Sequence, residues 1–272
     1  MMERRGEARG KERGNMTQEA RLDTLIEMLL RERADGGRIA IPQDARDRRM
    51  LLRALMNLRP PAPVSEAFLR VQDEYLRAEG AARGVVRVEA LEPARPGVYL
   101  WQGDITTLAA DAIVNAANSG MLGCFAPCHG CIDNAIHSAA GVQLRLACAA
   151  QMRGRAEPAG RARITRAYNL PCKWVIHTVG PIVEGEVTAR DRALLKSCYR
   201  ACMDCARENG LRNIAFCCVS TGEYRFPNAE AARIALETVL EYRNEHADAP
   251  EVIFNVFKDV DLEIYRELLG GR

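Results

Sequence analysis

Beyond residue 85 the sequence alternates short apolar runs with longer stretches of helical periodicity. The apolar runs lie at 98–101, 112–116, 162–165, 174–178, 213–219 and 252–257. The helical stretches lie at 131–151, 189–209, 228–244 and 261–268. Strands that alternate with helices form a largely parallel sheet covered by helices on both faces. We therefore expect an α/β fold, in which ligands bind beyond the carboxyl ends of the strands.

A layer of helices is expected before this α/β region. Thr17 is the expected N-cap of a first helix, which Gly36-Gly37 would stop. Its apolar stripe comprises Leu22, Leu25, Ile26, Leu29 and Leu30. Further helices are expected over 44–57 and from Ser65 onward. The predicted organisation is a disordered segment at 1–16, a helical extension at 17–84 and the α/β domain at 85–272.

Composition excludes several classes of protein. Among the 272 residues, 38 Lys and Arg stand against 36 Asp and Glu, so the net charge of +2 lacks the basic excess of a nucleic-acid-coating protein. No apolar run approaches the roughly 18 residues of a membrane span, and the charged N-terminus is no secretory signal. We therefore expect a cytoplasmic protein, without nucleic-acid or membrane partners, whose ten cysteines are thiols, metal ligands or core residues.

One connection in this sequence holds soft metal ligands at close spacing. Cys124, Cys128, His129 and Cys131 lie within eight residues. Thiolate and imidazole ligands favour zinc over magnesium or calcium. Because adjacent residues rarely point at one ion, Cys128 and His129 are not expected to bind it together. Three protein ligands would leave a position for water or a substrate hydroxyl, as in catalytic zinc sites. A closed structural site and a Cys128–Cys131 redox pair are the alternatives.

Polar groups suited to a sugar and a phosphate surround this connection. Asp104 follows one strand, and Asn115 and Asn118 close the next, where an unpaired buried amide would be costly. The segment 220–227 follows the strand at 213–219 and precedes a helix. Its glycine and hydroxyl residues present backbone N–H groups and a helix dipole to an anion. An N-cap role for Asp104 and an ordinary turn at 220–227 are the alternatives.

Several ordered motifs resemble a macrodomain, the ADP-ribose-binding α/β module. They are Gly103–Thr106, Asn115–Asn118, and Asp133–His137 with Gly141. The Cys-His-Cys insertion resembles the zinc-dependent branch of macrodomain hydrolases, as do Leu55–Pro61 and Gln72–Leu76 in the helical extension. The resemblance implies a macrodomain-type mixed, largely parallel sheet preceded by a helical layer.

The resemblance also implies roles for individual residues. It favours one zinc ion per chain, held by Cys124, His129 and Cys131. The residues expected to bind the nucleotide are Asp104, Ile105, Asn115, Asn118, Ser220, Thr221, Gly222, Glu223, Tyr224, Phe226 and Phe257. In this set Asp104 would accept a hydrogen bond from the adenine amine, and Asn118 would hold the distal ribose. Asp133 would position or activate water, so Asp133 and Asn118 are the expected catalytic pair.

Some members of this set have a second interpretation. Asn115 could tie down its loop, and Phe257, expected to stack on adenine, could be a core aromatic. The 220–227 loop departs from the common Gly-rich form by placing Glu223 and Arg225 where smaller residues often occur.

The function expected from this resemblance is hydrolysis that removes ADP-ribose from modified protein side chains. Asp/Glu-linked mono-ADP-ribose is the favoured linkage, and a lipoate-carrying protein modified by a sirtuin-type transferase is a candidate target. The competing functions are an ADP-ribose-binding reader with a structural zinc and a metal-stabilised interaction module that works through its helical layer.

Other cysteines and histidines are expected to be structural. Cys198, Cys202 and Cys205 have iron–sulfur-like spacing, but they fall on one face of a helical run and are expected in the core. His137 and His177 are expected to be packed, structural groups.

Overall fold

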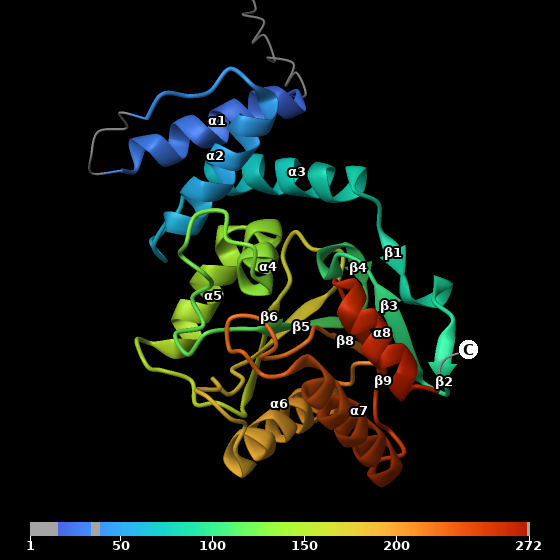
Figure 1. Ribbon diagram of the computed structural model, residues 1–272. Coiled ribbons are helices and arrows are strands. Elements are labelled where there is room, and N and C mark those ends of the chain that lie inside the picture. Colours follow the sequence, from blue (N-terminus) through green and yellow to red (C-terminus); the bar gives the residue numbers. More distant parts are fainter. Residues whose placement is uncertain (1–15, 34–38, 271–272) are drawn as a thin grey trace, which may run out of the picture.

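The computed structural model describes residues 16–33 and 39–270, and its first part is a layer of three helices (Figure 1). They are α1 (Gln18–Arg31), α2 (Ala45–Leu58) and α3 (Glu66–Ala82). Each begins where a side chain accepts a hydrogen bond from the first-turn backbone, at Thr17, Asp44 and Ser65. These three caps confirm the expected helix starts. Of the segment 1–16 that was expected to be disordered, residues 1–15 lie outside the described residues, as does the stop at Gly36-Gly37.

The helical layer has a hydrophobic core of its own. The expected stripe of α1 is buried against Leu52, Leu55, Phe68 and Tyr75 of the other two helices. Val142, from the domain that follows, belongs to the same core. The layer is therefore packed onto the α/β domain. The division at residues 84 and 85 stays a prediction, although helix gives way to strand between Ala82 and Val86.

A largely parallel sheet forms the centre of the α/β domain. Among the described residues, seven strands lie in the order β2-β3-β9-β8-β5-β7-β6. Their bounds are β2 (Pro93–Arg95), β3 (Val98–Gln102), β5 (Ala112–Ala116), β6 (Ala162–Arg166), β7 (Trp174–Thr178), β8 (Asn213–Phe216) and β9 (Glu251–Val256). The five inner strands run parallel, and the edge strands β2 and β6 pair antiparallel. This confirms the expected mixed, largely parallel sheet.

Helices cover both faces of this sheet (Figure 1). Helices α4 (Ile132–Ala140) and α5 (Val142–Met152) lie on the face that carries the helical layer. Helices α6 (Ala189–Glu208) and α7 (Asn228–Glu245) lie on the opposite face, and α8 (Asp259–Leu268) packs against α7. The remaining elements are β1 (Val86–Arg87), which pairs with β4 (Leu108–Ala109), and the 3-10 helices η1 (Val88–Ala90) and η2 (Ile105–Thr107).

The helical stretch expected over 131–151 consists of two helices, α4 and α5, because the chain breaks at Gly141. This glycine has φ 94° and ψ 175°, a conformation that a side chain would strain. Gln72 of α3 lies against the break, and its Oε1 accepts a hydrogen bond from the Val142 N–H at 2.9 Å. The helical layer thus satisfies one of the first N–H groups of α5.

Further differences concern the strands. The edge strand β2 was not expected, because Pro93–Arg95 lacks an apolar run. The strand expected over 213–219 ends at Phe216, which releases the following residues into a loop at the carboxyl edge of the sheet.

The interpretation of the helical cysteines as core residues is confirmed. Cys198 and Cys202 of α6 are fully buried in the main core, and Cys205 packs against it. No helix in the described parts of the chain is both long and apolar enough to cross a bilayer.

The break at Gly141 generates a stability prediction. Gly141→Ala should lower the free energy of unfolding by about 1–3 kcal/mol, because the residue is held in a conformation reserved for glycine. An added Cβ would also lie 2.6 Å from Gln72 Nε2. Urea denaturation of the two proteins measures the difference.

The matched control is a glycine inside a helix. Gly80 lies in α3, and an added Cβ would meet nothing within 4 Å. Gly80→Ala should therefore raise stability by about 0.5–1 kcal/mol. Equal effects at the two sites would contradict this account of the break.

Candidate active site

A cavity of about 760 Å³ lies at the carboxyl edge of the parallel sheet. It is bordered by the segments that follow β3, β5, β8 and β9, together with the start of α4. The expected site residues that line it are Asp104, Ile105, Asn118, Cys124, His129, Cys131, Asp133, Ser220, Thr221, Gly222, Glu223, Tyr224 and Phe257. The fold therefore gathers these residues, which lie far apart in the sequence, at one site.

Two residues expected to contact the nucleotide do not line the cavity. Phe226 is 1% exposed and belongs to the main core, because its apolar ring is buried below the loop that carries it. Asn115 is fully buried, and its Nδ2 donates a hydrogen bond to Asp133 Oδ1 at 2.8 Å. The expectation of direct contact is corrected for both side chains. Asn115 acts instead on a neighbouring residue of the site.

A buried carboxylate stands at the centre of the site. Asp133, in the first turn of α4, is only 4% exposed. Its Oδ2 accepts a hydrogen bond of 3.3 Å from Asn118 Nδ2, and the Asn115 amide binds its other oxygen. Burial raises the pKa of Asp133 to about 6, and the Asn115 hydrogen bond opposes that shift. The two amides hold the carboxyl group in one orientation at the cavity wall.

The histidines behind this carboxylate differ from each other. His177 is satisfied, since Nδ1 lies 3.2 Å from Asn115 Nδ2 and Nε2 lies 2.9 Å from Thr165 Oγ1. His137 is also buried, but among the described residues neither of its ring nitrogens has a hydrogen-bond partner. Its Nε2 lies 3.5 Å from Asp133 Oδ1. Because burial lowers the pKa of His137 well below its usual value, the imidazole is neutral and this contact is no ion pair.

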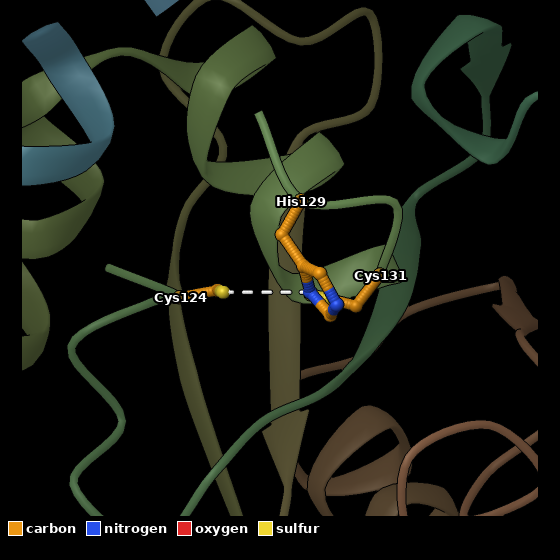
Figure 2. A group of neighbouring side chains, drawn as sticks. All are labelled: Cys124, His129 and Cys131. Atoms are coloured by element: carbon orange, nitrogen blue, oxygen red, sulfur yellow. Dashed lines mark hydrogen bonds between the residues drawn. The ribbon is translucent and has the colours of Figure 1, made fainter. Parts of the chain in front are cut away.

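The expected metal ligands come together at one side of the cavity. The ligand atoms of Cys124, His129 and Cys131 lie within 4.8 Å of one another, with Cys124 Sγ 3.6 Å from His129 Nδ1 (Figure 2). Cys131 is the N-cap of α4, and its sulfur accepts a hydrogen bond from Asn134 N. Burial raises the pKa of the Cys131 thiol to about 11. Two sulfurs and one imidazole nitrogen form a donor set that fits zinc.

The neighbouring Cys128 points away from this group. Its Sγ donates to the Met50 carbonyl of α2 at 3.3 Å, and its N–H donates to Asn57 Oδ1. The residue has φ 54°, which turns the chain between the ligands. This geometry agrees with three ligands rather than a closed set of four.

A residue of the helical layer also lines the cavity, and sequence reasoning missed it. Arg53 of α2 donates hydrogen bonds to the His129 carbonyl and to Asn134 Oδ1. The first of these contacts joins residues 76 positions apart. No local signal connects them, because Arg53 lies in an ordinary amphipathic helix.

The opposite side of the cavity carries Asp104 and Phe257. Asp104 caps η2 through a 2.9 Å hydrogen bond from Thr106 N, and its other oxygen pairs with Arg83 Nη1 at 2.9 Å. It therefore serves as a cap and as part of the cavity wall. Phe257 follows β9 and is 75% exposed, so it is no core aromatic. Its ring is free to stack on a planar group.

The loop after β8 completes the wall between these two ends. The Ser220 Oγ is buried without a hydrogen-bond partner among the described residues, and Ser220 lines the cavity. Ser220 and Arg225 have φ values of 66° and 57°, as in a tight turn. Glu223 extends toward the expected metal ligands, with its Oε1 3.5 Å from His129 Nε2. Arg225 does not line the cavity.

Known proteins resemble this chain along most of its length. The family model described as Macro domain matches residues 114–235. A protein-ADP-ribose hydrolase of Treponema medium is 50% identical over 261 residues, which cover 94% of this chain and 100% of that protein. A protein-ADP-ribose hydrolase of Staphylococcus aureus (strain MSSA476) is 47% identical over 91% of this chain and 94% of that protein.

A solved structure agrees with the fold. The Trypanosoma brucei macrodomain in complex with ADP-ribose matches with a TM-score of 0.64 and 33% identity, over 80% of this chain and 95% of that one. With its largely parallel sheet, its cavity at the carboxyl edge and relatives of this identity and coverage, the chain belongs to the macrodomain family.

Proposed function

We propose that this protein hydrolyses the bond between ADP-ribose and a modified protein side chain, most favourably an aspartate or glutamate. The observation that carries the proposal is the buried Asp133 carboxyl group, which two asparagine amides hold at the wall of a nucleotide-sized cavity. A module that only binds ADP-ribose needs no such group. The names of the relatives in Treponema and Staphylococcus support the same reaction.

The nucleotide would lie along the cavity from Phe257 to Asp133. Asp104 and Phe257 suit the adenine, because a carboxylate can accept from its amine and an exposed ring can stack on its face. The loop at 220–224 offers the unpaired Ser220 hydroxyl and backbone N–H groups to the diphosphate. This arrangement would bring the distal ribose to Asn118 and Asp133.

Zinc is part of the proposal. Cys124, His129 and Cys131 would hold it, because their soft donor atoms already lie within 4.8 Å of one another. When bound, zinc supplies a Lewis acid that polarises an oxygen of the distal ribose or of water.

The protein's own residues would do the remaining work. Asn118 would hold a hydroxyl of the distal ribose, and Asp133 would orient the attacking water and accept its proton. Water adds across the ester bond as that bond breaks, and its oxygen is retained in one of the two products. The products are free ADP-ribose and the carboxylate of the acceptor side chain. Asn115 contributes by keeping the Asp133 carboxyl group in place.

The first prediction concerns turnover. The protein should release ADP-ribose from an aspartate- or glutamate-modified protein, and Asp133→Ala should slow this release by about 10²–10⁴-fold. The variant should keep binding ADP-ribose, because recognition of the nucleotide does not need a water-orienting carboxyl group. Chromatographic detection of released ADP-ribose and calorimetric titration of the same samples measure both quantities.

The substrates in this assay would include a modified lipoate-carrying protein, the candidate target that the family resemblance suggests. Tight binding without release from any linkage would overturn the hydrolase proposal and identify a reader of ADP-ribose.

A second prediction concerns zinc. The purified protein should hold about one zinc per chain, and Cys124→Ala should lose it together with turnover. Cys128→Ala is the matched control, since its sulfur faces the Met50 carbonyl and should leave the zinc content unchanged. Elemental analysis of the wild type and both variants measures the zinc content per chain. A zinc-free but active Cys124→Ala protein would contradict the role of the metal.

A third prediction concerns the adenine end. Phe257→Ala should weaken ADP-ribose binding roughly tenfold, because stacking on an aromatic ring contributes about 1–3 kcal/mol per base. Since the ring is largely exposed, unfolding stability should hardly change. The nearby Val260→Ala, which removes another exposed side chain outside the cavity, is the control. Equal affinities for wild type and Phe257→Ala in titration calorimetry would refute the stacking.

A further inference from the structure

The helical layer makes direct contact with the segment that carries the metal ligands, residues 123–131, here called the metal loop. Arg53 of α2 donates from Nη2 to the His129 carbonyl at 3.0 Å. The same guanidinium donates from Nε and Nη2 to Asn134 Oδ1 at 3.0 and 2.7 Å. One side chain thus joins the metal loop to the first turn of α4.

The two groups that accept hydrogen bonds from Arg53 lie next to His129 and Cys131, two of the proposed metal ligands. The carbonyl belongs to His129 itself. Asn134 donates its backbone N–H to Cys131 Sγ at 3.4 Å, and its Nδ2 donates to the Ala126 carbonyl at 2.9 Å. Arg53 therefore contacts His129 directly, at the His129 backbone carbonyl, and contacts Cys131 indirectly, through Asn134. An arginine has no lone pair to offer a metal, so any effect on the centre must pass through these partners.

A second contact from the same helix sets the shape of the loop. Asn57 Oδ1 accepts from the Cys128 N–H at 2.9 Å, while Asn57 Nδ2 donates to Ser138 Oγ at 3.0 Å. This bond holds Cys128 in its left-handed conformation, with its sulfur away from the ligand group. The helix thus restrains the loop both at the ligands and between them.

Two other arginines, one in α2 and one at its C-cap, hold the helical layer together instead. Arg48 pairs with Asp23 of α1 at 2.8 Å, and Arg59 pairs with Glu32 at 2.6 Å. Arg53, in contrast, has no carboxylate partner among the described residues, and its hydrogen bonds all go to His129 and Asn134. Its guanidinium also borders the cavity. Its contacts therefore serve the site rather than the packing of the layer.

We propose that Arg53 is a positioning residue for the metal centre, which sets the orientation of His129 and Cys131 and so makes the helical layer part of the active site. This inference rests on the proposed zinc site. Residues that orient metal ligands typically change metal affinity by 10–100-fold when removed. The forked geometry of the guanidinium is essential, because a lysine offers a single ammonium point.

The test compares Arg53→Ala, Arg53→Lys and Arg48→Ala in the full chain. Zinc affinity is measured by competition with a chromophoric chelator, and the visible spectrum of the cobalt-substituted protein reports the geometry of the ligands. We expect Arg53→Ala to bind zinc roughly 10–100-fold more weakly, with an altered cobalt spectrum. Arg53→Lys should recover only part of the affinity. Arg48→Ala, which breaks an ion pair inside the layer, should lower stability and leave zinc affinity and the spectrum unchanged.

The outcomes separate this inference from the proposed function. Wild-type affinity and an unchanged cobalt spectrum in Arg53→Ala would overturn the role of Arg53 and leave the zinc proposal intact. A wild-type protein that binds neither zinc nor cobalt would overturn the zinc proposal and this inference with it. Should Arg53→Ala fail to fold, Arg53→Lys decides, because an unchanged affinity and spectrum there would equally refute the inference.

Discussion

The buried carboxyl group of Asp133 is the constraint on which the rest of the site depends. A carboxylate that is almost fully removed from water is costly unless hydrogen bonds compensate for the lost solvation. Here the compensation comes from Asn115 and Asn118, at and just beyond the end of β5. The fully buried Asn115 can reach the Asp133 carboxyl group only because β5 is held between β7 and β8, with Asn115 opposite His177. The centre of the sheet therefore determines where the carboxyl group lies.

The metal loop is restrained from two sides, and both involve the end of α2. Arg53 and Asn57 hold the loop directly. Arg145 of α5 donates to the Leu122 carbonyl just before the loop and to the Asn57 carbonyl at the end of α2. The loop thus lies between the helical layer and the α/β domain. Holding three side chains of a short segment rich in glycine and small residues in one arrangement costs conformational entropy. The hydrogen bonds from Arg53, Asn57 and Arg145 help to offset this cost.

The sequence predicts most of the fold because its apolar runs and caps are local signals. Each expected run beyond residue 85 overlaps an observed strand, and Thr17, Asp44 and Ser65 cap the starts of their helices. The grouping of Cys124, His129 and Cys131 also follows from local spacing. Two of the departures from the prediction have causes that are not local. The break at Gly141 depends on Gln72 from α3, and the burial of Phe226 depends on the main core. Arg53 was missed for the same reason.

The order of groups along the cavity also comes from the sheet and not from the chain. In sequence the site segments follow β3, β5, β8 and β9, but in space the strands run β3-β9-β8-β5. The groups suited to adenine therefore follow the adjacent strands β3 and β9, the loop at 220–224 follows β8, and Asn118 follows β5. With neighbouring strands about 4.8 Å apart, the three steps from β3 to β5 span about 14 Å. Adenine, diphosphate and distal ribose occur in this order in ADP-ribose, so an extended nucleotide would meet each group in turn. The crossover connections that reorder the strands are what would place the ribose end beside Asp133 and the proposed metal ligands.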